Sequence, residues 1–309
     1  MKVAIDFDNT FYTPNRDVDD GLALMYLLGS SQVDLVGITS CFGNAPIEEV
    51  DQSTQRLIEE LGLESIPYAK GAKEAGDYLS PASQLLVDLA DRYAGDLCLL
   101  ATGSLANLQG AYLRDPQFFD KVKQIVLMGG TVAPLIFAKS EMLELNFSCD
   151  PQATLTVLSK GKNVSILTGN ACLDVLFTRE DYDQAFAGQE GRVTRLIETY
   201  SDPWFVDNDL EYGIKGFYNW DSLAAAYLVD PQLFQDNLAS YRVSIQSLSK
   251  GSLLADQEDP TTYVVTKPIR QVSLNLPRVK SAPEVKQALF DRWLTVDSQL
   301  ERRRMDGKY

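Results

Sequence analysis

The chain has 309 residues, of which 45% are hydrophobic, and its net charge at pH 7 is −15. The length suits one large α/β domain, and we expect a single domain over residues 1–309. The negative charge, with no basic stripe to offset it, argues against nucleic acid and anionic membrane surfaces as partners. The chain contains no histidine, which excludes any mechanism that needs a histidine acid, base or metal ligand.

The remaining composition points to a cytoplasmic protein without a membrane anchor. No run reaches the roughly 18 consecutive apolar residues of a membrane span, and the first residues lack the pattern of a secretion signal. The four cysteines are widely spaced and form no CxxC pair, which predicts reduced thiols. We therefore expect a soluble protein of the cytoplasm.

Short apolar strands alternate with helix-like segments along the first half of the chain. Strands are predicted at residues 2–8, 33–40, 97–101, 125–128 and 164–167. Helices are predicted at residues 19–29, 47–61 and 151–158. This alternation predicts an α/β fold with an open, mostly parallel, doubly wound (Rossmann-like) sheet and helices on both of its faces.

The pattern is less regular after residue 200. We expect residues 200–220 to be an irregular, aromatic-rich segment that covers a site. Late strands are predicted at residues 241–245 and 272–276, and a closing helix at residues 282–300.

Polar residues gather where the predicted strands end. Asp6 and Asp8 follow the first strand, and Asp17, Asp19 and Asp20 come soon after. Gly43-Asn44, Thr102-Gly103 and Gly129-Gly130 follow the later strands. Because these ends share one edge of a doubly wound sheet, we expect a cleft floored by acids and amides. Several carboxylates at one place repel one another unless a cation or protons neutralise them.

One interpretation of the first acids is that they are the catalytic residues of a phosphohydrolase. Asp6-Phe-Asp8-Asn-Thr10 resembles the DxDxT motif of haloacid dehalogenase-like phosphatases, in which the first aspartate is the nucleophile and Mg²⁺ is the cofactor. Thr39-Ser40 would supply the family's strand-end hydroxyl. The sequence offers no convincing lysine followed by a strand-end acidic pair. This alternative, with Asp6 as nucleophile, stays open.

A second resemblance covers more of the chain, about residues 2 to 234. Asp6-Phe-Asp8 and Asp19-Asp20 resemble the two halves of the DxDPGxDD motif of inosine-uridine preferring nucleoside hydrolases, separated here by an insertion (residues 9–18). Further matches follow in the family's order: GN at 43–44, TGSLANL at 102–108, MGG at 128–130, ELN at 144–146, DPQA at 150–153 and WDSLA at 220–224.

This resemblance implies a Ca²⁺-dependent N-ribohydrolase with the nucleoside hydrolase fold. Carried over residue by residue, the Ca²⁺ ligands would be Asp8, Asp20, the backbone carbonyl of Leu127, and Asp221. Such oxygen donors suit a hard cation. The metal would lower the pKa of a bound water, and Asp8 would take the proton of this nucleophile as general base. The sugar hydroxyls would be held by Asp19, Asn44, Glu144 and Asn146.

Trp220 stands where many members of this family have histidine. A subgroup that prefers purine nucleosides has tryptophan at this position, where stacking on the purine raises its basicity so that solvent can protonate it. The resemblance therefore implies a purine ribonucleoside as the small-molecule substrate, free base and ribose as products, and a place in purine salvage. A second stacking aromatic is needed, and the sequence does not choose among Tyr12, Tyr78, Trp204, Phe205, Tyr212 and Tyr218.

The chain also departs from the family's pattern. The family's asparagine near the sugar 5′ hydroxyl has no clear match in residues 134–142. The insertion would fold over the site, and its Arg16 would meet a charged substituent, whereas Asp17 is assigned no role and Asp6 a supporting one.

We expect a homodimer or homotetramer. A third interpretation is a nucleoside-binding relative in which the insertion impairs catalysis.

Overall fold

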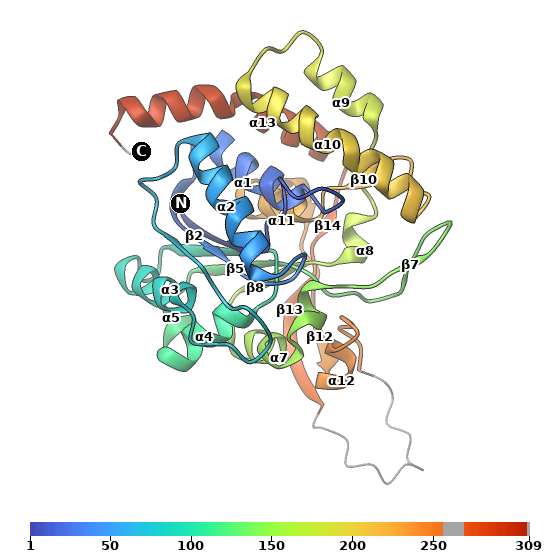
Figure 1. Cartoon of the computed structure of the whole chain (residues 1–309). Helices are drawn as coiled ribbons and strands as arrows, with labels where there is room; N and C mark the ends of the chain where they lie inside the picture. The colour runs from blue at the N-terminus through green and yellow to red at the C-terminus, as the bar shows by residue number, and fades with distance from the viewer. Residues whose placement is uncertain (256–268, 308–309) are drawn as a thin grey trace.

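The computed structural model describes residues 1–255 and 269–307 (Figure 1). Its centre is an eight-stranded sheet. In sheet order the strands are β12 (Leu238–Val243), β13 (Arg270–Asn275), β8 (Val164–Leu167), β5 (Gln124–Met128), β4 (Leu97–Ala101), β1 (Lys2–Phe7), β2 (Asp34–Ser40) and β3 (Tyr68–Ala69). All neighbours pair in parallel except β12, which runs antiparallel to β13. This topology confirms the predicted open, mostly parallel α/β sheet.

Helices cover both faces of the sheet (Figure 1). One face carries α1 (Asp19–Gly29), α2 (Ile47–Leu61), α9 (Arg179–Phe186), α10 (Arg192–Glu211), α11 (Trp220–Val229) and α13 (Ala282–Met305). The other carries α3 (Pro81–Arg92), α4 (Ala106–Arg114), α5 (Phe118–Lys121), α7 (Pro151–Lys160) and α12 (Ile245–Leu248). Two separate apolar clusters, one on each face, result from this layering.

Short elements connect these layers. They are α6 (Asn146–Cys149), α8 (Gly169–Cys172), the 3₁₀ turn η1 (Pro231–Leu233), and the strand pairs β6 (Leu135–Ile136) with β7 (Glu141–Met142), β9 (Leu176–Phe177) with β10 (Phe217–Tyr218), and β11 (Phe234–Gln235) with β14 (Arg278–Val279). The hairpin of β6 and β7 projects from the body of the molecule (Figure 1).

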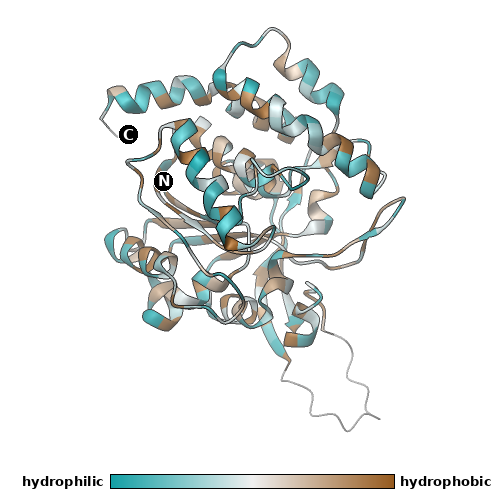
Figure 2. Cartoon of the chain, in the orientation of Figure 1, coloured by the Kyte–Doolittle hydropathy of each residue, from teal (hydrophilic) through white to brown (hydrophobic). Residues whose placement is uncertain are grey.

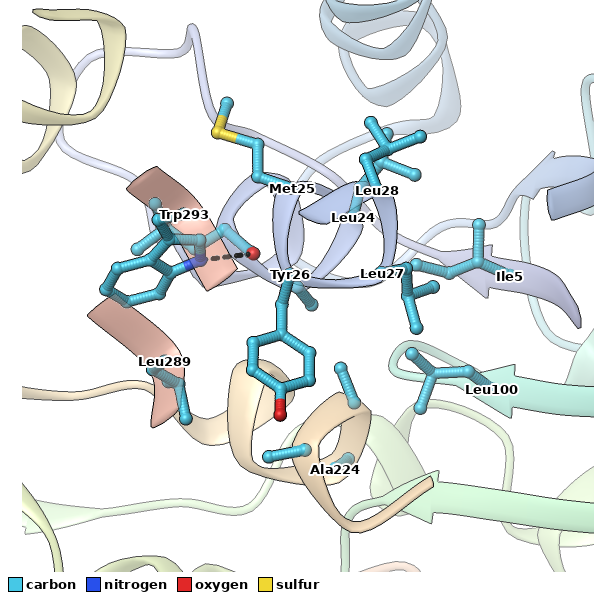
Figure 3. Close-up of a cluster of buried hydrophobic side chains, with 14 of the residues drawn as sticks. Ile5, Leu24, Met25, Tyr26, Leu27, Leu28, Leu100, Ala224, Leu289 and Trp293 are labelled. Carbon is cyan, nitrogen blue, oxygen red and sulfur yellow. Dashed lines mark hydrogen bonds between the residues drawn. The ribbon is translucent and has the colours of Figure 1, made fainter. Parts of the chain in front are cut away.

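Helix α1 lies in the middle of the larger apolar cluster. Every one of its residues is buried, as expected for a helix that is apolar on all sides. It packs against α11 and α13, and the indole N–H of Trp293 donates a hydrogen bond of 3.0 Å to the carbonyl of Leu22 (Figure 3). This packing fixes the first turn of α1, and with it Asp19 and Asp20, at one edge of the sheet.

The expectation of an irregular segment over residues 200–220 is wrong for its first half. Helix α10 runs through Pro203 to Glu211. Its buried residues Ile197, Ser201 and Phe205 recur every four positions, so they form one stripe that packs on the core. Figure 2 shows hydrophilic and hydrophobic residues alternating along α10. Packing of this stripe therefore outweighs the helix-breaking tendency of one internal proline.

Three smaller points complete the comparison with the predictions. The late strands begin earlier than expected, β12 at Leu238 and β13 at Arg270. All four cysteines are free thiols. Among the described helices, none combines the length and the apolar composition that crossing a lipid bilayer requires.

Candidate active site

A pocket of about 340 Å³ lies at the carboxyl ends of the parallel strands. Strands β1 and β4 are neighbours there, while the chain leaves β1 toward β2 on the opposite side. Ligands of doubly wound sheets bind at such a switch point, because the connections diverge and leave a crevice. The residues that follow the strand ends, Asn44, Thr102 and Gly169, all line the pocket.

Asp8 follows directly on β1 and is fully buried. The backbone N–H of Asn44 donates a hydrogen bond of 2.6 Å to its Oδ2, and the side-chain amide of Asn44 lies 3.4 Å from its Oδ1. A Cβ placed on Gly43 would lie 1.9 Å from the same Oδ2, so only glycine lets this loop approach Asp8 so closely. The turn after β2 therefore holds the Asp8 carboxylate in one orientation.

Three further carboxylates meet beside Asp8. One oxygen each from Asp19, Asp20 and Asp221 lie within 4.8 Å of one another, and all three residues are buried. The hydroxyl of Thr102 donates a 2.8 Å hydrogen bond to Asp20, and the backbone N–H of Asp221 donates one of 3.0 Å to Asp19. Two N-terminal helix turns, those of α1 and α11, thus present their acids to one point.

The pocket surface is formed by the outer members of this cluster. Asp19 and Asp221 line the pocket together with Asn44 and Thr102. Asp8 and Asp20 lie directly behind Asn44 and Thr102, to which they are hydrogen-bonded.

The electrostatics of the cluster fit a cation. Burial, followed by repulsion from Asp8 and Asp19, raises the pKa of Asp20 well above its ordinary value. Burial raises the pKa of Asp8 to about 7, and it also raises the pKa of Asp221. In the described part of the chain no lysine or arginine forms an ion pair with these acids. Crowded carboxylates without a counter-charge are the donor set that a hard divalent cation prefers.

Leu127, whose carbonyl the resemblance assigns to the metal, lies inside β5. It is paired with Ala101 on one side and Ile166 on the other. The next residue, Met128, lines the pocket.

The two polar residues predicted further along the chain, Glu144 and Asn146, both line the pocket. The Glu144 carboxylate accepts hydrogen bonds from the backbone N–H groups of Gly130 at 3.0 Å and Phe147 at 2.9 Å. Burial raises its pKa to about 7. The side-chain amide of Asn146 donates to the carbonyl of Thr102 at 2.9 Å. Both side chains are therefore held by the backbone of the strand ends.

Asp6 faces a different part of the molecule from Asp8. Its Oδ1 accepts hydrogen bonds from Thr39 at 2.6 Å and Asn107 at 2.8 Å, and it is not among the residues that line the pocket. Its Oδ2 is buried and has no hydrogen-bond partner. This position suits the supporting role, because the Asp6 carboxylate is held by Thr39 and Asn107 and makes no hydrogen bond to the described residues that line the pocket.

Aromatic side chains form another part of the pocket wall. Trp220, 9% exposed, lines the pocket and packs against Tyr218 with ring centroids 5.0 Å apart. Trp204 and Tyr212, both from the α10 region, line the pocket as well. The other candidates lie elsewhere: Tyr12 packs on Tyr200, Tyr78 bonds to Asp150, and Phe205 packs on Phe217. Of the six aromatic residues considered, the structure leaves Trp204 and Tyr212 facing the pocket and Tyr218 behind Trp220.

Two polar residues that no motif indicated, Asn208 and Glu211, also line the pocket. Positions 204, 208 and 212 are spaced by four residues, the interval that places side chains on one face of a helix. That spacing is visible in the sequence. It indicates a shared helix face only if residues 200–212 are helical, whereas irregular structure was expected there.

The insertion also contributes to the pocket. Asn15, Arg16 and Asp17 line its rim. Asp17, to which the sequence assigned no role, makes local contacts here: its Oδ1 accepts hydrogen bonds from the backbone N–H groups of Val18 at 2.7 Å and Asp19 at 3.3 Å. Sequence alone missed this contact because an insertion relative to the family pattern carries no motif of its own.

Comparison with known proteins gives a consistent result. A family model described as inosine-uridine preferring nucleoside hydrolase matches residues 3–290. A probable uridine nucleosidase 1 from Oryza sativa subsp. japonica is 27% identical over 285 residues, which cover 81% of this chain and 85% of that protein. Two solved structures share the fold. A plant nucleoside hydrolase has a TM-score of 0.80 and 21% identity, over 95% of this chain and 98% of that one. A purine-preferring ribonucleoside hydrolase from Gardnerella vaginalis has a TM-score of 0.77 and 22% identity, over 96% and 100%.

Proposed function

This chain belongs to the inosine-uridine preferring nucleoside hydrolase family, and from that premise we propose that it is a Ca²⁺-dependent N-ribohydrolase that prefers purine ribonucleosides. The family supports hydrolysis of N-glycosyl bonds in nucleosides. The observation that carries the finer proposal is one pocket lined both by members of an acid cluster, Asp19 and Asp221, and by the aromatic side chain of Trp220. The acids suit a cation and sugar hydroxyls, whereas the aromatic wall suits a flat base.

The acidic and amide side chains of the site would bind the cation and the sugar. Asp8, Asp20, Asp221 and the Leu127 carbonyl would hold Ca²⁺, and Asp19, Asn44, Glu144 and Asn146 would hold the ribose hydroxyls. When bound, Ca²⁺ supplies positive charge that lowers the pKa of the attacking water. Asp8 accepts the proton of that water as general base. The hydrogen bond from the Asn44 backbone fixes the Asp8 carboxylate for this transfer.

The aromatic side chains that line the pocket would bind the base. Trp220 stacks on the purine, and Tyr218 behind it fixes the plane of the indole. Stacking of aromatic rings contributes about 0.5–1.5 kcal/mol beyond area burial. Trp204, Asn208 and Tyr212 extend one helix face along the same pocket, which gives the base a further aromatic neighbour and a hydrogen-bonding amide.

Hydrolysis of uridine is the second candidate. It is favoured by the name of the relative from Oryza sativa, a probable uridine nucleosidase, whereas the solved structure from Gardnerella vaginalis is named purine-preferring. The two candidates differ in the base and share the chemistry at the sugar.

The experiment that tests the proposal measures ribose release from inosine, guanosine, adenosine, uridine and cytidine. The purified full chain is assayed with Ca²⁺ and with EDTA, and released base is identified by chromatography. We expect inosine or guanosine to be hydrolysed fastest, activity to vanish in EDTA and Ca²⁺ to restore it. A preference for uridine would establish the second candidate. Tight binding of nucleosides with no release from any of them would indicate the impaired nucleoside-binding alternative.

A further inference from the structure

Arg16 is the one cationic side chain among the described residues that line the pocket. The acids Asp17, Asp19, Asp221 and Glu211 line the same pocket. Within the described part of the chain its guanidinium makes no ion pair or hydrogen bond, although the pocket is rich in acids. A guanidinium that is permanently charged and has unused N–H donors is available to a ligand.

The loop that carries Arg16 is fixed at both ends. On one side Phe11 is buried against α1, where a Cβ on Gly21 would lie 2.5 Å from its ring. On the other side the Thr10 hydroxyl donates a 2.9 Å hydrogen bond to the carbonyl of Asp17, the residue after Arg16. The backbone at Arg16 is therefore held at the rim of the pocket, and its side chain is exposed there.

Cleavage of the N-glycosidic bond calls for hydrogen-bond donors to the departing base, in addition to its stacking on Trp220. The electron pair of the C1′–N bond moves to the departing base, which becomes negatively charged unless it is stabilised or protonated. The chain has no histidine to act as the acid. Burial and a hydrogen bond to Glu211 raise the pKa of Tyr212 to about 12, which makes its phenol a weak acid. The side-chain amides of Asn44 and Asn146 already donate hydrogen bonds to the Asp8 carboxylate and to the Thr102 carbonyl.

We propose that Arg16 is a catalytic residue that donates hydrogen bonds to the departing nucleobase and stabilises its developing negative charge. This role rests on the proposed nucleoside hydrolysis. Hydrogen-bond donors that meet a developing charge stabilise a transition state more than the ground state. Arg16 lies on the same pocket as Trp204, Tyr212 and Trp220, which the base would contact.

The step balances without a proton from Arg16. The C1′–N bond breaks with its electron pair on the base, the oxygen of water bonds to C1′, and the proton of that water passes to Asp8. Arginine keeps all its protons, because the guanidinium does not deprotonate in proteins. Solvent then protonates the base and takes the proton back from Asp8, and the products are ribose and neutral base.

The test compares two leaving groups. A purine or pyrimidine nucleoside needs stabilisation of its departing base, whereas p-nitrophenyl β-D-ribofuranoside releases a phenolate that is stable without it. We expect Arg16→Gln to lower kcat for the best nucleoside by about 10- to 100-fold, less than loss of a fully buried donor because Arg16 is exposed. Hydrolysis of the p-nitrophenyl riboside should stay within about threefold of wild type, and Arg16→Lys should recover part of the nucleoside activity, since it keeps the charge.

Arg56 provides the matched control. It lies beside the same insertion, 4.1 Å from the Tyr12 ring, and donates a 2.8 Å hydrogen bond to the Tyr200 hydroxyl, but it does not line the pocket. Arg56→Gln removes the same charge and should leave the ratio of the two substrates unchanged. Thermal unfolding of all variants verifies that they fold.

Three results would overturn the role of Arg16. One is an equal loss with both substrates, which would place Arg16 on the sugar. Another is unchanged nucleoside turnover in Arg16→Gln. The third is a raised KM confined to nucleoside monophosphates, which would make Arg16 a site for an anionic substituent. If the wild-type chain hydrolyses neither the nucleosides nor the p-nitrophenyl riboside, it is the proposed function that fails.

Discussion

The floor and the rim of the pocket are built in different ways. The floor consists of Asp19 and Asp221 at the pocket surface and of Asp8 and Asp20 directly behind it. All four are nearly inaccessible and follow or begin core elements. The rim consists of the insertion, the end of α10 and the β6–β7 hairpin, where Leu143 is 81% exposed. Chemistry that needs fixed charges is thus placed on the packed core, and contacts that distinguish substrates are placed on segments that tolerate change.

The contrast extends to the forces that hold each region. In the floor, backbone N–H groups and the Thr102 hydroxyl orient the carboxylates, and the burial of α1 fixes them. In the rim, a few hydrogen bonds of Asp17 and Thr10 and the packing of Phe11 hold the insertion. Substitutions in the floor should therefore abolish hydrolysis. Substitutions in the rim should instead change the relative rates at which different nucleosides are hydrolysed.

The largest expected effect separates two neighbouring aspartates. Asp8→Asn should lower kcat by about 10³-fold or more, because it removes both the general base and a cation ligand. Asp6→Asn should keep most of the activity, since an amide oxygen still accepts the hydrogen bonds from Thr39 and Asn107. Steady-state hydrolysis of the best nucleoside checks both. A larger loss of kcat in Asp6→Asn than in Asp8→Asn would indicate that Asp6 is the catalytic residue.

The second effect concerns the charge of the floor. Burial raises the folded-state pKa of Asp8 and Glu144 to about 7, whereas the unfolded values lie near 4. The folded state therefore holds protons that the unfolded state has released, so without metal the free energy of unfolding should fall as pH rises from about 4 to 7. Ca²⁺ at about 100 times its Kd should add about 2.7 kcal/mol at pH 7.5.

Thermal unfolding at pH 5 and pH 7.5, with EDTA or Ca²⁺, measures this effect. Asp221→Asn is the control, because it removes one cation ligand and should reduce both the response to Ca²⁺ and the loss of stability at higher pH. Equal Tm values with EDTA and Ca²⁺ at pH 7.5 would mean that the floor does not bind the cation.

The third effect tests the aromatic wall. Trp220→Ala should lower purine turnover by about 10-fold or more, which corresponds to about 1.4 kcal/mol, while KM changes less. Trp220→Phe keeps a stacking ring in the same position against Tyr218 and should retain part of kcat. If kcat and KM change by the same factor in Trp220→Ala, the indole only packs and does not activate the leaving base.

The smallest effect should appear on the rim. Trp204→Leu should change the ratio of kcat/KM for inosine and uridine by about threefold, because one extra aromatic contact is worth about 1 kcal/mol or less. Val206→Ala lies on the same helix but is exposed and does not line the pocket, so it should leave the ratio unchanged. Equal effects of the two substitutions would show that α10 contributes stability and not discrimination.

Local patterns predicted the floor well. Continuous apolar runs followed by polar residues located β1, β4 and β5, and the buried α1 was visible as an apolar segment that begins in acids. The spacing of the DxD and DD halves, together with WDSLA at 220–224, indicates a nucleoside hydrolase from the order of the residues alone. The family match over residues 3–290 confirms that interpretation.

The rim shows where local patterns are insufficient. The sequence pattern over residues 200–220 predicts irregular structure, whereas the stripe of Ile197, Ser201 and Phe205 gains stability only from the core on which α10 packs. Asp17 looks like part of a loop without a role, yet its carboxylate accepts hydrogen bonds from the backbone that leads into α1.

By itself the sequence determined the strand ends, the acids that follow them and the absence of histidine, since these depend on local order and composition. Only the tertiary structure decided which of several aromatic residues face the pocket and where Arg16 lies. Those positions depend on contacts between segments far apart in the chain, such as Thr102 with Asp20 or Tyr12 with Tyr200. Local propensity does not encode such contacts, because their free energy arises from burial and hydrogen bonding that exist only once the layers have packed.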